Sequence, residues 1–112
     1  MPEPSRYSLE DVSQTPGVFR LSGEIDESNV DNVETELSSS VGHRRAVVDL
    51  SSLRFIDSAG FKMLLSVGTS REIALVLSPT AVPRRAMEVL GLKALIPVFD
   101  STDEATKGFL SP

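Results

Sequence analysis

The amino-acid sequence predicts an α/β protein: a single domain over residues 1–112, with its core at about residues 6–108. We expect a mixed sheet of four to five strands, antiparallel at its N-terminal edge and packed with about four helices. Three observations predict this class. Two alternating segments near the N-terminus are typical of a hairpin, the stretch 46–77 has the pattern strand–helix–strand, and two further helical segments follow it. The length leaves room for one hydrophobic core.

The first two strands are predicted on either side of the Thr15-Pro16-Gly17 turn. Apolar residues alternate with polar ones in the segments 6–13 and 18–22, as in an antiparallel hairpin with one face in water. Gly23 is expected to close the second strand, and residues 24–26 to lead into a polar loop.

A helix is predicted next, because from about Ser28 the apolar residues recur at a period near 3.6. Gly42 is expected to end this helix. Acidic residues and serines occupy its opposite face. Its buried stripe is predicted to be Val30, Val33, Leu37 and Val41.

Two later segments, 46–50 and 73–77, are nearly continuous apolar runs. Such runs suit neighbouring strands of a parallel pair that are covered on both faces. Phe61, Leu64 and Leu65 recur between them at helical spacing. The stretch therefore predicts a crossover helix that connects two parallel strands.

The remainder of the chain predicts two more helices and a short strand. Pro83 suits the first turn of one helix, and Gly91 its end. Val98–Phe99 is a short strand candidate, and Ser101 with Glu104 matches a capping box that opens the last short helix. From helical spacing, the buried stripe of the first of these helices is predicted to be Val82, Ala86, Val89 and Leu90.

Composition and charge exclude several classes of function. Eleven basic and sixteen acidic residues give a net charge of −5, so phosphate backbones repel the protein and we expect no nucleic-acid partner. The basic pairs 44–45 and 84–85 are expected to be solvated surface. The chain has no cysteine, which excludes disulfides and thiolate metal sites, and we expect neither a metal nor a cofactor. No apolar run approaches the roughly 20 residues that span a bilayer, and no signal peptide is evident, so we expect a cytoplasmic protein without membrane insertion.

The candidate site is the predicted strand-to-helix junction at residues 55–61, FIDSAGF. Backbone N–H groups converge at such junctions. Asp57 and Ser58 carry short oxygen-bearing side chains that suit the start of a helix, and Gly60 leaves room for a close approach. Phe61 places a large apolar group beside this polar tip. Spacing alone favours a plain helix cap at Asp57 or Ser58.

Two kinds of enzyme fit the sequence poorly. The hydrolase motif G-x-S-x-G would need a glycine where Ile56 stands, and the single histidine, His43, precedes Ser58 instead of following it. A receiver-like domain that accepts phosphate on Asp49 would need a pair of adjacent carboxylates for Mg²⁺, and the acids in the loop 23–26 are not adjacent. We therefore expect that the protein is not an enzyme.

The segment VVDLSSLRFIDSAGF, residues 47–61, resembles the signature of the STAS family, named after sulphate transporters and anti-sigma factor antagonists. LSGEID is similar to the family's second strand and the loop after it, and GLKALIPVFDSTDEA is similar to its closing segment. Three separated motifs in the family's order cover most of the chain. A lone domain without membrane spans resembles the anti-sigma factor antagonist branch.

The resemblance implies a phosphorylation switch. Such an antagonist binds an anti-sigma factor, which is itself a serine kinase with its own ATP site, and thereby frees a sigma factor for transcription. The kinase phosphorylates the serine that matches Ser58, binding is lost, and a metal-dependent Ser/Thr phosphatase restores it. The resemblance assigns the surroundings of the phosphosite and the partner-binding surface to Gly23, Asp26, Asp57, Ala59, Gly60 and Phe61.

A second function stays open at this point. The chain could be a constitutive STAS scaffold, a subunit of a stress-signalling or transport complex, in which Ser58 is only a helix cap. Phosphorylation at Ser58 with loss of binding would distinguish the switch from the scaffold.

Overall fold

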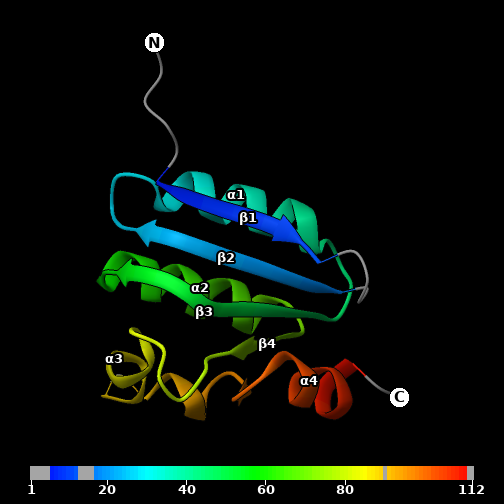
Figure 1. Ribbon diagram of the computed structural model, residues 1–112. Helices are drawn as coiled ribbons and strands as arrows, with labels where there is room; N and C mark the ends of the chain where they lie inside the picture. The colour runs from blue at the N-terminus through cyan, green and yellow to red at the C-terminus, as the bar shows by residue number, and fades with distance from the viewer. Residues whose placement is uncertain (1–5, 13–16, 90, 111–112) are drawn as a thin grey trace.

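The computed structural model describes residues 6–12, 17–89 and 91–110 and has the α/β architecture that the sequence predicts (Figure 1). Five strands form one sheet in the order β1-β2-β3-β4-β5. β1 is antiparallel to β2, and the other three pairs are parallel, which confirms the antiparallel N-terminal edge. The strands are β1 (Tyr7–Asp11), β2 (Val18–Ile25), β3 (Ala46–Ile56), β4 (Ile73–Val76) and β5 (Val98–Phe99).

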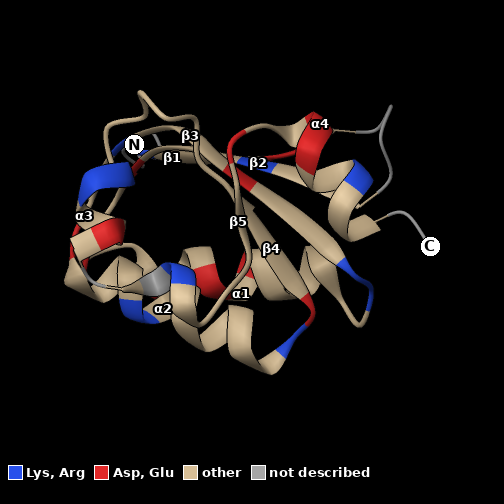
Figure 2. Cartoon of the chain, turned by 90° about the horizontal axis from the view of Figure 1, so that it is seen from below, with Lys and Arg blue, Asp and Glu red and all other residues tan. Residues whose placement is uncertain are grey.

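Helices cover both faces of the sheet (Figures 1 and 2). α1 and α2 lie on one face, whereas α4 lies on the other. None of the helices in the described ranges combines the length and the apolar character that crossing a bilayer requires. The helices are α1 (Val30–Val41), α2 (Ser58–Ser70), α3 (Arg84–Val89) with the 3₁₀ turn η1 (Leu92–Ala94), and α4 (Thr102–Ala105), which continues as the π-helical turn η2 (Thr106–Leu110).

The central strands are buried on both faces, as their continuous apolar runs predict. Successive side chains of a strand point to opposite faces, so Val48 and Leu75 join the core under α1 and α2. Val47 and Ala74 join a second, smaller core with Ala105 of α4. The crossover from β3 through α2 to β4 connects two parallel strands, as predicted.

β2 is longer than predicted and does not close at Gly23. The strand runs on to Ile25, and the register with β3 shifts at Gly23, where φ is +95°. A Cβ at this position would lie 2.2 Å from the Arg6 carbonyl oxygen, so only glycine lets the start of β1 approach so closely. The predicted turn before β2 falls largely on residues 13–16, which lie outside the described residues.

β3 also exceeds its predicted length and carries the candidate site to the end of the molecule. It extends from Ala46 to Ile56, but it pairs with β4 only over residues 46–49. Residues 52–56 continue the ladder with β2 alone. The corner that follows β3 therefore lies beyond the end of β4, next to the end of β2 (Figure 1).

The predicted buried stripe of α3 is wrong. Val82 is 73% exposed, Val89 is 80% exposed and Ala86 is also exposed, whereas Leu90 lies outside the described residues. The helix instead packs on the sheet through Met87, which is 3% exposed. The apolar spacing correctly indicated a helix but pointed to its outward face.

The basic pair at 84–85 is not uniformly solvated. The Arg84 side chain is only 15% exposed, and its guanidinium donates to the Leu77 carbonyl at the end of β4 and to Asp100 after β5. Arg85 is exposed, as predicted for both residues. Arg84 thus connects the end of β4 to the end of β5 through its hydrogen bonds.

Candidate functional site

The corner between β3 and α2 presents the hydroxyl of Ser58 to solvent. Asp57 is the N-cap of α2, and its Oδ1 accepts the N–H of Gly60 at 3.0 Å. Ser58 is the first helical residue and is exposed, followed by the partly exposed Ala59. Among the described residues the Ser58 hydroxyl has no hydrogen-bond partner. Of the two predicted cap candidates Asp57 does the capping, so the view of Ser58 as the cap is wrong.

The second carboxylate oxygen of Asp57 ties the corner to the loop after β2. Asp57 Oδ2 accepts the N–H of Glu27 at 3.1 Å, and the Asp57 N–H donates to the Ile25 carbonyl at 3.2 Å. The two loops that follow β2 and β3 therefore lie side by side. This brings the segment containing Asp26 next to the segment containing Ser58, although the two are far apart in sequence.

Asp26 is fixed by three hydrogen bonds. Its Oδ1 accepts from Arg6 Nη2 at 2.7 Å, from Ser28 Oγ at 2.6 Å and from the Ser28 N–H at 2.9 Å. The Arg6 guanidinium, followed by the Ser28 hydroxyl, holds the pKa of the Asp26 carboxyl well below its usual range. Asp26 therefore stays ionised near the corner at neutral pH.

The glycine and the aromatic residue at the start of α2 serve packing. A Cβ on Gly60 would lie 2.5 Å from Ile56 Cγ1 and 3.2 Å from Ile25 Cγ2. The space that Gly60 leaves is thus filled by the ends of β2 and β3, and it does not receive a ligand. Phe61 is 9% exposed and belongs to the main core, so its side chain supports the corner from inside and offers little contact to a partner.

The exposed aromatic side chain near the corner is Phe55, which sequence reasoning missed. Phe55 is 49% exposed, whereas its neighbour Ile56 packs against the main core. Adjacent residues of a strand point to opposite faces. Recognition that β3 continues to Ile56 would have found it, because one member of the Phe55–Ile56 pair must then face outward.

The geometry disfavours a serine hydrolase at this corner. His43 lies just before β3 and Ser58 just after it. The eleven residues of β3 separate them by about 35 Å at the usual rise of a strand. The imidazole therefore lies far outside hydrogen-bond reach of the hydroxyl.

Asp49 is engaged in the sheet and is not free to accept phosphate. It is 7% exposed, its Oδ1 accepts the Ser51 N–H at 2.9 Å, and its Oδ2 lies 3.6 Å from Arg20 Nε. In the described part of the chain, no group of three or more His, Cys, Asp or Glu residues is arranged to hold a metal ion. The receiver-like alternative therefore has no geometric support.

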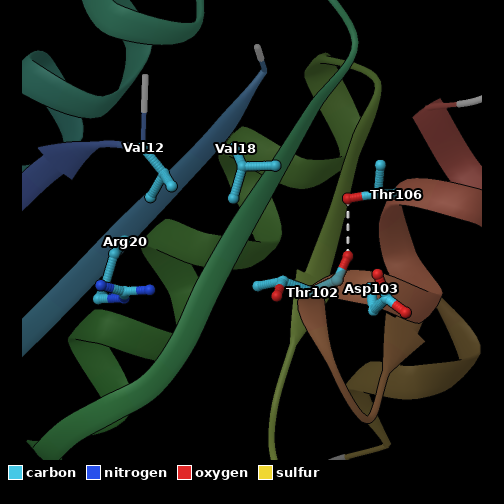
Figure 3. Close-up of a pocket in the computed structure, with 6 residues that line it drawn as sticks. All are labelled: Val12, Val18, Arg20, Thr102, Asp103 and Thr106. Atoms are coloured by element: carbon cyan, nitrogen blue, oxygen red, sulfur yellow. Dashed lines mark hydrogen bonds between the residues drawn. The ribbon is translucent and has the colours of Figure 1, made fainter. Parts of the chain in front are cut away.

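A shallow pocket lies on the α4 side of the sheet (Figure 3). Thr106 Oγ1 donates to the Thr102 carbonyl at 2.7 Å beside it. Its volume is about 130 Å³, smaller than the roughly 300–1,000 Å³ of typical small-molecule sites. It is lined by Val12, Val18, Arg20, Thr102, Asp103 and Thr106.

The fold and the corner together define a small α/β protein that offers one serine hydroxyl at the start of a helix. Comparison with known proteins identifies its family. The model of the STAS domain matches residues 8–105. BtrV of Bordetella bronchiseptica, named as an anti-sigma factor antagonist, is 33% identical over 97 residues, which cover 80% of this chain and 82% of that protein. The chain belongs to the STAS domain family, in its anti-sigma factor antagonist branch.

Solved structures agree with this assignment. An anti-sigma factor antagonist from Mycobacterium paratuberculosis superimposes with a TM-score of 0.75 at 26% identity, over 94% of this chain and 93% of that chain. The anti-sigma factor antagonist SpoIIAA in its unphosphorylated form has a TM-score of 0.63 at 24% identity, over 90% and 93%. At this lower identity the second likeness shows the shared fold.

Proposed function

We propose that this protein binds an anti-sigma factor serine kinase while Ser58 is unphosphorylated, and that phosphorylation of Ser58 by that kinase ends the complex. Binding of the anti-sigma factor releases a sigma factor, and a Ser/Thr phosphatase resets the switch. The kinase supplies the ATP site. The proposal implies a cytoplasmic protein, because sigma factors act there with RNA polymerase.

One observation carries the proposal: Ser58 is exposed, and its hydroxyl makes no hydrogen bond within the described part of the chain. Asp57 caps α2 in its place. A serine that held the helix cap would lose that bond on phosphorylation, whereas Ser58 can be modified without loss of any hydrogen bond among the described residues. Membership of the antagonist branch supports the same role.

The start of α2 can accept a phosphate. The first N–H groups of a helix have no intrahelical acceptor, and the Gly60 N–H is taken by Asp57. The N–H groups of Ser58 and Ala59 remain for an anion, which the helix dipole also favours. We therefore expect the fold to tolerate the modification.

The same phosphate would disrupt an interface. It adds about −1.5 to −2 charges at pH 7, next to the carboxylate of Asp57 and near that of Asp26, which is paired with Arg6. Burial of this cluster against a surface shaped for a neutral hydroxyl leaves like charges in contact and unpaired charge, at a cost of several kcal/mol. A loss of roughly a hundredfold or more in affinity follows. The half-exposed Phe55 provides an apolar contact beside this charge-sensitive point.

The test combines mass spectrometry with calorimetric binding. The protein is incubated with Mg-ATP and, one at a time, with purified anti-sigma factor serine kinases from its own genome. We expect one phosphate on Ser58 and a roughly hundredfold weaker complex for Ser58→Asp. Ser58→Ala should bind without being labelled. Ser39→Asp, an exposed serine near the far end of α1, is the matched control and should bind like the wild type.

Two results would contradict the switch. If Ser58→Asp bound a kinase as tightly as the wild type, the added charge would not regulate the complex. If a stable complex formed without any label on Ser58, the constitutive scaffold would be the better description.

A further inference from the structure

The outward face of α3 is apolar at helical spacing and has no partner in the described residues. Val82, Ala86 and Val89 follow one another at intervals of four and three residues and are all exposed. Pro83 and Met87, on the opposite side, are buried. Four large apolar side chains are exposed in the described ranges, and three of them lie within residues 82–95; the four are Phe55, Val82, Val89 and Leu95. We call the exposed side chains of Val82, Arg85, Ala86, Val89, Lys93 and Leu95 the α3 patch.

The α3 patch is also the basic part of an acidic protein. Residues 82–95 contain three basic residues and one acidic residue, a net charge of +2, whereas the other residues of the chain carry eight basic and fifteen acidic ones, a net charge of −7. The guanidinium of Arg84 is engaged in hydrogen bonds to the Leu77 carbonyl and to Asp100. Arg85 on α3 and Lys93 in the following turn η1 remain exposed.

The patch lies at the same end of the molecule as Ser58. β3 and β4 are parallel, so the segments that follow them, the start of α2 and the approach to α3, emerge at one edge of the sheet. Figure 1 shows α3 at the end where β3 finishes and α2 begins. In Figure 2, basic segments of α3 and α2 lie at this same end. A single partner can therefore contact both sites.

We infer that the α3 patch is a second docking surface for the protein that contacts Ser58, and that it fits an acidic surface with apolar residues at its centre. This inference rests on the proposed function and names the chemistry of the partner. The corner supplies the contact that phosphorylation abolishes, and the α3 patch supplies affinity through aliphatic burial and opposite charge. Exposed aliphatic stripes rimmed by charge are typical of protein interfaces.

Two other occupants fit the patch less well. A symmetric contact between two copies would gather Arg85 and Lys93 of both copies in one interface, where like charges repel. An anionic membrane would attract these two cations by only about 1 kcal/mol each and would repel the rest of the chain, with its charge of −7. An acidic partner protein avoids both penalties.

The test compares variants of the α3 patch by surface plasmon resonance on the immobilised kinase that phosphorylates Ser58, and by urea unfolding. The double variant Val82→Ser and Val89→Ser should bind the kinase at least tenfold more weakly with an unchanged unfolding midpoint, because both side chains are exposed. Arg85→Glu should slow association several-fold at low salt and lose that effect at high salt. Lys107→Glu, an exposed lysine on η2, makes the same change in net charge away from the patch and should bind like the wild type.

The outcomes separate this inference from the proposed function. If Ser58→Asp weakens binding but the patch variants bind like the wild type, the α3 patch is not a docking surface and the switch stands. If the patch variants change only the self-association of the chain in sedimentation, the patch is a contact between copies, and the inference is wrong. If no kinase binds any form, both proposals fail.

Discussion

Asp57 is the residue on which the geometry of the corner depends, because each of its carboxylate oxygens holds a different segment. One caps α2 at Gly60, and the other receives the Glu27 N–H from the neighbouring loop. A partner that binds at Ser58 therefore meets a hydroxyl on a fixed segment of backbone. Two hydrogen bonds, both accepted by the carboxylate of the preceding residue, hold that segment in place.

Substitution of Asp57 separates these two roles. Asp57→Ala loses the cap and the bond to Glu27, and it should lower the free energy of unfolding by about 2 kcal/mol. Asp57→Asn keeps one acceptor oxygen and caps about as well, so it should lose about half as much. Urea unfolding measures both. Equal losses for the two variants would show that the charge of Asp57, and not its hydrogen bonds, stabilises the corner.

Asp26 should make stability depend on pH. Its folded pKa lies below the unfolded value, which is near 3.9. The ionised carboxylate therefore stabilises the fold above the unfolded pKa, and this contribution is lost as the pH falls through the folded pKa. The difference in unfolding midpoint between the wild type and Asp26→Asn should be constant above about pH 5 and should shrink as the pH falls below about 4.

Arg6 provides the control for this pH dependence, because its hydrogen bond is the largest cause of the lowered pKa of Asp26. Arg6→Gln should reduce the pH-dependent part of the stability while Asp26 is still present. A difference between wild type and Asp26→Asn that did not change between pH 7 and pH 2 would contradict the assignment.

At the scale of elements, α3 illustrates how a correct helix prediction can still give the wrong face. The apolar spacing of Val82, Ala86 and Val89 is genuine, and a residue pattern alone does not say whether the sheet or a partner covers it. In the observed orientation the guanidinium of Arg84 donates to the Leu77 carbonyl after β4 and to Asp100 after β5. That contact joins residues distant in sequence and leaves no local signal.

The neighbouring arginines offer a matched pair for a test of this tie. Arg84→Met leaves the Leu77 carbonyl and Asp100 without their donor and should lower the free energy of unfolding by about 1–3 kcal/mol. Arg85→Met, one residue further on and exposed, should change it by no more than about 0.5 kcal/mol. Thermal and urea unfolding of both variants measures this difference. Equal effects would show that the Arg84 contacts contribute nothing to stability.

At the scale of the whole molecule, the proposed switch changes what the protein binds and leaves its fold intact. An anion at the start of α2 is favoured by the helix dipole, so Ser58→Asp should keep or raise the free energy of unfolding, by up to about 1 kcal/mol. Ser70→Asp, the same substitution at the last residue of α2, should lower it slightly, because negative charge is unfavourable there. Circular dichroism during urea titration measures both. A large loss of stability for Ser58→Asp would mean that phosphorylation acts by unfolding.

Much of the fold and of the site is encoded locally and could be predicted. Alternation gave the hairpin, continuous apolar runs gave β3 and β4, and short polar residues before Gly60 marked the corner. The errors all depended on distant contacts. The end of β2 depends on how closely Arg6 approaches Gly23. The choice between Phe55 and Phe61 as the exposed aromatic depends on where β3 stops.

The unequal lengths of β3 and β4 have a consequence for access. Residues 50–56 carry β3 about 20 Å beyond its last ladder pair with β4. The corner with Ser58 therefore lies past the end of β4, beside the loop that follows β2 and over the packed start of α2. Because Ser58 is exposed and Asp57 holds the corner in place, we expect a kinase to reach this hydroxyl in the fully folded state, with no need for local unfolding.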